Sequence, residues 1–265
     1  MLLFKSLINY LIGKTSGNLF CLLRTFLENI LYGSNRTLYY KNNHYFRIFK
    51  KNKKKIFFPD KERTRLYSRG YDYRLDSLSE MYLLNAINFK DGDTVIDCGA
   101  NIGEIKLLLD NLNKKINYYA FEPGNREFRC LKKNLTNGNF YNYGLWHKKT
   151  YMSFYEKTDT ADSSFIKNGE FEKISKKKVI RIDNLKFKKI KLFKVEAEGA
   201  EPEVLLGATK ILKKIKFISV DCGPERGLKL EKTDKTVIKF LKSHKFNLIR
   251  RSKMRDVFLF KNSNY

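Results

Sequence analysis

The stretch Thr94–Leu109, TVIDCGANIGEIKLLL, decides the fold that we expect for this chain. Its first five residues form an apolar run typical of a buried strand, and the residues after Gly103 are apolar at helical spacing. Gly99 and Gly103 lie in the turn between them, where glycines let the backbone bend sharply and let a ligand lie against the main chain. Free N–H groups at the start of a helix favour a negative or polar ligand group. The stretch therefore predicts a strand, a ligand-binding turn and a helix.

An acid at the end of the strand indicates which ligand the turn binds. The spacing is D-x-G-x-x-x-G and lacks the G-x-G-x-x-G pattern that binds the pyrophosphate of a dinucleotide. An aspartate aimed into the crevice would repel a pyrophosphate but suits an ammonium group, such as the amino acid end of S-adenosylmethionine. We predict that cofactor, with a site formed by Asp97, Gly99, Ala100, Asn101 and Gly103. The alternative is an ordinary turn that Asp97 merely caps.

A second acid follows the next predicted strand. The segment NYYAFEP ends in Glu122 and Pro123, about 20 residues after the glycine turn, where an acid accepts hydrogen bonds from ribose hydroxyls. Pro123 ends the strand and fixes the path of the chain into the following helix. We add both residues to the predicted cofactor site.

Further acids stand at the ends of two later strands, and the carboxyl ends of parallel strands meet at one edge of a sheet. Glu196 and Glu198 follow the run KLFKV, and Asp221 ends the run ISVD. These three are candidate bases for removing a proton from a hydroxyl group, because a carboxylate within hydrogen-bond reach can accept it. The alternative for each is capping a helix or pairing with a basic residue. For Glu201, at a helix start, we favour the cap.

The loop after Asp221 holds two candidate substrate ligands, Glu225 and Arg226. Arg226 would bind an acidic group of the substrate or pair with Glu225, and the sequence does not separate these alternatives. His, Cys, Asp and Glu do not form a metal-ligand pattern, so we predict no metal.

Taken together, these segments resemble a known family. VIDCGANIG, AFEP, ADSS, VIRIDNL, KVEAEGAEPEVLLGA and ISVDCGPERG, in this order over roughly residues 76–260, resemble the FkbM family of methyltransferases. The resemblance implies a class I (Rossmann-like) fold with a seven-stranded, mostly parallel sheet and a reversed last strand. It also implies S-adenosylmethionine as cofactor and O-methylation of sugars, polysaccharides or natural products. Glu196 departs from the family, whose strand usually ends in Asp there.

The first 75 residues precede this domain, which we place at residues 76–265. Apolar residues between Leu2 and Ile12 and between Leu19 and Leu31 repeat at helical spacing and predict two amphipathic helices. We favour packing of these helices on the core over docking to a membrane surface, which is the alternative. Residues 41–75 are basic and aromatic, with lysines at 51–55, and would form a solvated hairpin or a phosphate-binding face.

The composition limits the class of protein and its partners. A hydrophobic fraction of 42% excludes wholesale disorder, and the net charge of +26 favours anionic partners unless it reflects codon bias. Scattered cysteines and the lack of a signal-peptide pattern favour the cytoplasm, with peripheral membrane contact as an addition. The leading hypothesis is O-methylation of a glycan, a lipid-linked sugar or a small molecule. A nucleic-acid methyltransferase and a noncatalytic binding module are the alternatives, and the oligomeric state stays open.

Overall fold

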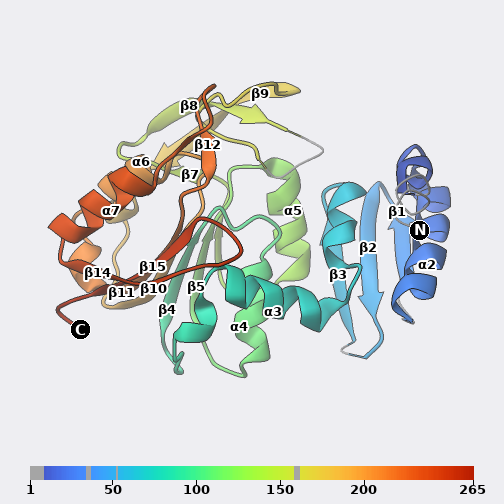
Figure 1. Cartoon of the computed structure of the whole chain (residues 1–265), viewed down its shortest axis with the longest axis horizontal. Coiled ribbons are helices and arrows are strands. Elements are labelled where there is room, and N and C mark those ends of the chain that lie inside the picture. Colours follow the sequence, from blue (N-terminus) through green and yellow to red (C-terminus); the bar gives the residue numbers. More distant parts are fainter. Residues whose placement is uncertain (1–8, 34–36, 52, 158–161) are drawn as a thin grey trace.

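The computed structural model describes residues 9–33, 37–51, 53–157 and 162–265. Its centre is a seven-stranded sheet with the strand order β14-β15-β11-β10-β4-β5-β6 (Figure 1). The bounds of these strands are β4 Thr94–Cys98, β5 Asn117–Phe121, β6 Asn139–Tyr141, β10 Ile190–Val195, β11 Ile215–Asp221, β14 Phe246–Arg251 and β15 Val257–Asn262. Neighbouring strands from β11 to β6 are parallel, whereas β15 is antiparallel to both β11 and β14. The predicted class I sheet with a reversed last strand is confirmed.

Helices cover both faces of the sheet, which explains why its strands are continuous apolar runs. On β4, Val95 packs into the core formed with α3, α4 and α5, and Ile96 points to the opposite core formed with α6 and α7. Figure 1 shows the two groups of helices on either side of the sheet. Their bounds are α3 Tyr71–Met81, α4 Glu104–Asn111, α5 Asn125–Asn134, α6 Glu201–Leu206 and α7 Asp234–Ser243.

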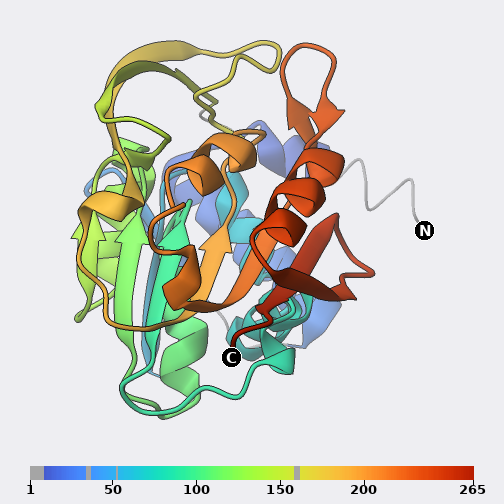
Figure 2. The ribbon, with the colours of Figure 1, turned by 90° about the vertical axis from the view of Figure 1, so that its left-hand side faces the viewer.

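A second sheet rises beside one end of the main sheet (Figure 2). The sequence pattern predicts an added β-pair at residues 151–155 and 179–182 around a polar loop. An antiparallel pair is present as β8 (Thr150–Glu156) and β9 (Lys173–Ile180), but its second strand begins six residues earlier than predicted. The sequence pattern predicts a single strand over residues 140–145, but the structure has two shorter strands there. The first is β6 of the main sheet, and the second is β7 (Gly144–Leu145), which pairs with β9.

The N-terminal part forms a unit of its own at the far end of the molecule from α7 (Figure 1). Helix α2 (Gly17–Tyr32) precedes an antiparallel sheet of β1 (Thr37–Lys41), β2 (His44–Phe49) and β3 (Lys54–Phe58). The lysines at 51, 53, 54 and 55 lie at the β2–β3 hairpin, in agreement with the hairpin that was one of the two interpretations of this segment. The first predicted amphipathic helix lies mostly outside the described residues. Among the described residues, no helix combines the length and the apolar character that crossing a membrane requires.

The sequence pattern predicts a helix over residues 76–88, but the observed helix α3 has different bounds. It begins five residues earlier, at Tyr71, directly after Gly70 with its positive φ of 118°. It ends at Met81, and Leu83 then takes the left-handed conformation with a φ of 60°. The predicted division between residues 75 and 76 therefore falls inside α3. A positive φ at a leucine is decided by packing, so the sequence pattern did not reveal this helix end.

Candidate functional site

A cavity of about 270 Å³ lies at the carboxyl ends of β4, β5 and β10, where open α/β sheets place their ligands. Helix α3, strand β8 and the Asp162–Phe165 segment complete its wall. Seven residues predicted to act in the site line it: Gly99, Ala100, Asn101, Glu122, Pro123, Glu196 and Glu198. Asp97, Gly103, Asp221, Glu225 and Arg226 do not belong to its lining.

The glycine turn lies directly against β10. Gly99 has a φ of +73°, and a Cβ added to it would lie 2.1 Å from the backbone oxygen of Glu196. The backbone N–H groups of Gly99 and Ala100 both donate to Phe121 O, at 3.0 and 3.1 Å. Only a residue without a side chain allows this close approach, so Gly99 joins the turn to the strand end that carries the candidate bases.

The structure places Asp97 beneath the turn instead of in the cavity. Its side chain is fully buried, with Oδ1 3.0 Å from Lys194 Nζ and Oδ2 accepting a hydrogen bond from the Tyr118 hydroxyl. Side chains alternate between the faces of a strand, and Asp97 shares the face of Val95 toward the core of α3–α5. The expectation that Asp97 points into the crevice toward an ammonium group is therefore corrected: its charge is already matched by Lys194.

Glu122 lines the cavity and is tied to the backbone on both sides. Oε2 accepts from Asn101 N at 2.8 Å, and Oε1 accepts from Gly124 N at 2.7 Å. Burial and the neighbouring charge of Glu127 raise the pKa of Glu122 to about 8, although the two backbone N–H groups oppose this rise. A buried carboxyl group with a raised pKa favours ligand groups that donate hydrogen bonds to it, such as a pair of ribose hydroxyls.

Two oxygen atoms in the cavity wall are candidates for hydrogen bonds from a ligand. Within the part of the chain that the structure describes, Asn101 Oδ1 and Glu198 Oε2 are buried and accept no hydrogen bond. Buried polar atoms are normally paired, so such atoms in a cavity indicate where a bound molecule donates. Glu122 and the Asn101 oxygen suit the ribose and ammonium groups of S-adenosylmethionine, which are O–H and N–H donors, and the Glu198 oxygen suits a further O–H donor beside it.

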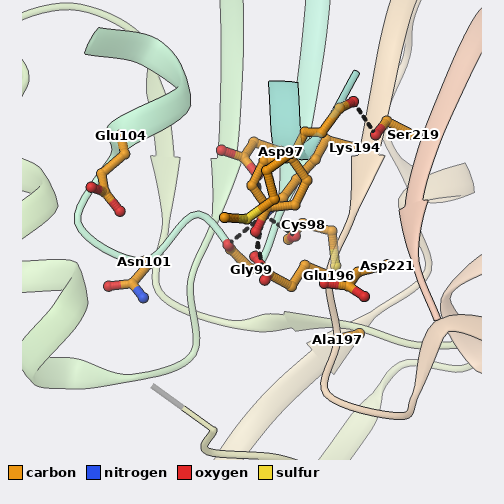
Figure 3. Close-up of polar contacts among 12 residues, drawn as sticks. Asp97, Cys98, Gly99, Asn101, Glu104, Lys194, Glu196, Ala197, Ser219 and Asp221 are labelled. Atoms are coloured by element: carbon orange, nitrogen blue, oxygen red, sulfur yellow. Dashed lines mark hydrogen bonds and ion pairs between the residues drawn. The ribbon is translucent and has the colours of Figure 1, made fainter. Parts of the chain in front are cut away.

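Glu196 is held as a permanent charge. It accepts a hydrogen bond from the Tyr82 hydroxyl at 2.6 Å, and it pairs with Lys194 at 3.0 Å and Arg255 at 3.2 Å. Burial by itself would raise its pKa, but the two cations outweigh burial and lower the pKa to about 2. Figure 3 shows Glu196 beside the turn that carries Gly99. A carboxylate with so low a pKa is a poor proton acceptor, so we expect Glu196 to order the site and not to act as its base.

Glu198 has the opposite environment. Its backbone is left-handed, with a φ of 48°, and the nearby acids Glu225, Glu196 and Asp162 add to the effect of burial. Burial and these charges raise the pKa of Glu198 well above its usual value, and Arg255 only partly opposes them. A carboxylate with a raised pKa and an unpaired oxygen can accept a proton from a bound molecule. Of the three candidate bases, Glu198 therefore fits the role best.

Asp221 and Glu225 belong to a cluster around Arg255. The Arg255 guanidinium lies 2.7 Å from Asp221 Oδ2 and 3.2 Å from Glu225 Oε1, in addition to its contact with Glu196. Burial and the charge of Glu196 raise the pKa of Asp221 to about 6, and burial and Asp221 raise that of Glu225 to about 8. Because neither side chain reaches the cavity, both stabilise the wall behind it.

Arg226 and Glu201 hold the loop that carries Glu198. Arg226 forms a two-bonded ion pair with Glu203, at 2.9 and 2.7 Å, and donates to Gly199 O at 2.6 Å. Neither alternative for Arg226 is observed, since it contacts Glu203 instead of Glu225 and lies outside the cavity. Glu201 begins α6 as predicted, but its Oε1 accepts from Ala197 N and Gly199 N, so it holds the preceding loop instead of capping the helix.

Two basic residues organise the acids, Lys194 and Arg255, and neither is among the predicted site residues. Lys194 is 2% exposed and, besides its two ion pairs, donates to Gly99 O at 2.8 Å. A lysine in the middle of an apolar strand is costly to bury without partners, and that was a usable signal. Arg255 lies in the turn between β14 and β15, and no sequence pattern connected it to the other strand ends. The described residues contain no group of His, Cys, Asp and Glu that could hold a metal ion.

Replacing Gly99 by alanine tests the close approach of the turn to β10. We expect Gly99→Ala to destabilise the protein clearly more than Gly92→Ala, measured as the free energy of unfolding in urea. Both glycines have positive φ, which costs a residue with a Cβ roughly 1–2 kcal/mol. Only at Gly99 does the new atom also meet the backbone, since no atom lies within 4 Å of a Cβ at Gly92. Equal losses for the two variants would contradict the packing described here.

Comparison with known families agrees with this geometry. The sequence profile of the Methyltransferase FkbM domain matches residues 97–248, more than half of the chain. The chain belongs to the FkbM methyltransferase family. No curated protein is similar enough in sequence to match it.

Several solved structures resemble this FkbM-family chain at low identity. The methyltransferase FkbM from Methylobacillus flagellatus is 15% identical with a TM-score of 0.49, and the match covers 76% of this chain and 52% of that chain. This chain thus spans about half the length of that relative. A putative rRNA-methylase from Clostridium thermocellum is 15% identical with a TM-score of 0.45, covering 69% and 95%. M. capricolum TrmK, in complex with S-adenosyl-homocysteine, is 14% identical with a TM-score of 0.40, covering 73% and 69%.

Proposed function

We propose that this protein is an S-adenosylmethionine-dependent O-methyltransferase whose acceptor is a hydroxyl group on a glycan, a lipid-linked sugar or a small molecule. The observation that carries the proposal is the contrast between two neighbouring carboxylates in one cavity. Glu196 is fully paired and has a pKa of about 2, whereas Glu198 has an unpaired oxygen and a raised pKa. Transfer to a hydroxyl needs such a proton acceptor.

The residues around the glycine turn would bind the donor. Glu122 would accept hydrogen bonds from the ribose hydroxyls, and the Asn101 amide oxygen would accept one from the ammonium group. When bound, S-adenosylmethionine supplies an activated methyl group on a sulfonium. Because the sulfonium leaves readily, the protein's main contribution is to align donor and acceptor. Strand β8 and the Asp162–Phe165 segment line the cavity and would shield the reacting groups from water.

Glu198 would act on the acceptor. Its carboxylate would accept the hydroxyl proton as the hydroxyl oxygen takes the methyl group, for which S-adenosylmethionine would supply the leaving group that keeps the electron pair. The products are a methyl ether, S-adenosylhomocysteine and protonated Glu198. Glu196 stays charged throughout, because Lys194 and Arg255 both hold it in the ionised form.

Calorimetry with S-adenosylhomocysteine tests the donor site. At pH 9, above the Glu122 pKa of about 8, we expect Glu122→Gln to weaken binding about 10- to 100-fold, because Glu122 is then ionised and a hydrogen bond to a charged group is worth roughly 1.5–3 kcal/mol. Glu80→Gln, on the exposed side of α3, is the matched control and should bind as the wild type does. Unfolding in urea shows whether Glu122→Gln keeps its fold. Undiminished binding by a folded Glu122→Gln variant, or no binding by the wild type, would refute the donor site.

A further inference from the structure

Helix α2 packs Phe20 and Cys21 into a small core with Leu38 of β1 but leaves another part of its apolar surface exposed. Its sequence contains two charged residues, Arg24 and Glu28, and both are buried, at 4% and 2% exposure. Four large apolar side chains one or two turns apart instead face the solvent. They are Leu19, Leu22, Phe26 and Ile30, with exposures of 55%, 68%, 68% and 65%. We call these four residues the α2 stripe. The favoured expectation, that this apolar face packs on the core, is wrong for these residues.

Buried charge pairing keeps the α2 stripe outward. Glu28 lies 2.7 Å from Arg47 Nη1 and accepts a second bond from Arg47 Nη2 at 2.9 Å, and the Ser68 hydroxyl also donates to it. Arg47 is fully buried and also donates to Thr64 O at 3.1 Å. Rotating the helix to bury the stripe would leave Arg47 as an uncompensated buried charge, which is strongly destabilising. The fold therefore maintains an exposed apolar surface.

The charge of the surrounding unit indicates what covers this surface. Residues 1–75 contain 16 Lys and Arg against 4 Asp and Glu. Basic segments are attracted to anionic lipid headgroups, and an adjoining apolar helix face can then enter the boundary between headgroups and acyl chains. A second copy of the chain would bring together two units of the same high charge, which opposes self-association at this face. Lys14, directly before α2, is exposed and places a cation at one end of the stripe.

We propose that the α2 stripe docks this protein to the surface of an anionic membrane. The helix lies in the plane of the interface and does not cross the bilayer. The stripe inserts between lipid headgroups while the lysines and arginines of the N-terminal unit contact the lipid phosphates. The short helix η1 (Glu62–Tyr67), which follows β3 within residues 1–75, contributes Arg63 and Leu66 to the cavity wall, so the docking unit and the cavity are directly connected.

Flotation with lipid vesicles tests this proposal independently of the proposed methyl transfer. We expect the full chain to float with vesicles in which one lipid in three is phosphatidylglycerol, and at least ten-fold less with pure phosphatidylcholine. The double variant Leu22→Glu/Phe26→Glu should lose at least ten-fold in binding to the anionic vesicles. Leu22→Ser/Phe26→Ser should also bind more weakly, because it removes the apolar groups without adding negative charge.

The control is Tyr151→Glu/Leu228→Glu, which makes the same change in charge at residues with 68% and 71% exposure outside the N-terminal unit. It should bind the anionic vesicles nearly as well as the wild type. A wild type that stays unbound, or α2 variants that bind as well as this control, would overturn the proposal. So would a dimer in solution that Leu22→Glu/Phe26→Glu converts to monomers, since the stripe would then be an interface between copies.

Discussion

Glu198→Gln is expected to lower kcat at least about 100-fold, the minimum that a general base commonly contributes. The amide keeps the size of the side chain but cannot accept the hydroxyl proton. S-adenosylhomocysteine should bind with unchanged affinity, because Glu198 faces the acceptor and not the donor residues Glu122 and Asn101. Single-turnover transfer of a labelled methyl group, combined with calorimetry, measures both quantities.

The pH dependence of the same reaction separates a base from a structural role. Burial and the neighbouring acids raise the pKa of Glu198, and only its ionised form accepts a proton. The wild-type kcat should therefore rise with pH until this raised pKa is passed and then level off. Glu198→Gln should lose this rise along with the activity. Glu231→Gln, on the exposed hairpin after Arg226, should keep both. A Glu198→Gln variant with wild-type kcat would assign the proton to another group.

Lys194→Met is expected to destabilise the protein by about 3–5 kcal/mol, as removal of one partner from a buried ion pair does. The change leaves Asp97 and one side of Glu196 buried without their cation, and it removes the bond that Lys194 donates to Gly99 O. Lys191→Met on the same strand is the matched control. Lys191 pairs with Asp93 at 3.4 Å nearer the surface, where a pair is worth about 1 kcal/mol or less. Urea unfolding of both variants compares the two losses.

Unfolding by acid tests the same ion pairs by protonating the carboxylate partner Glu196 instead of removing its cation. The pKa of Glu196 is lowered to about 2 from an ordinary value of 4.5, so its ionised form stabilises the folded state at neutral pH. That contribution is lost as the pH falls from about 4.5 toward 2, where the folded protein also takes up the proton. Lys194→Met should weaken this dependence, because it removes one of the two cations that lower the pKa. If Lys194→Met lowered the free energy of unfolding no more than Lys191→Met does, Lys194 would not be the residue that stabilises the buried acids.

The sequence by itself determined the sheet and the location of the cavity. The apolar run at Thr94–Cys98, the glycine turn and the acids at strand ends are local patterns, and parallel strands must bring their carboxyl ends to one edge. The same reasoning placed Glu122, Glu196 and Glu198 at the cavity. It could not give Glu196 and Glu198 different roles, since the pKa of a carboxyl group depends on which charges lie near it.

Tertiary structure alone decided those charges. Lys194 reaches the acids from β10 and Arg255 from the turn between β14 and β15, and their contacts fix Glu196 as an ion while Glu198 keeps an unpaired oxygen. The helical periodicity of α2 likewise could not predict which side of the helix is buried. An amphipathic pattern shows that a helix has an apolar face, but the partner of that face is set by what else must be buried. Here the buried pair of Glu28 with Arg47, which lies 19 residues away in the chain on β2, keeps the α2 stripe exposed to solvent.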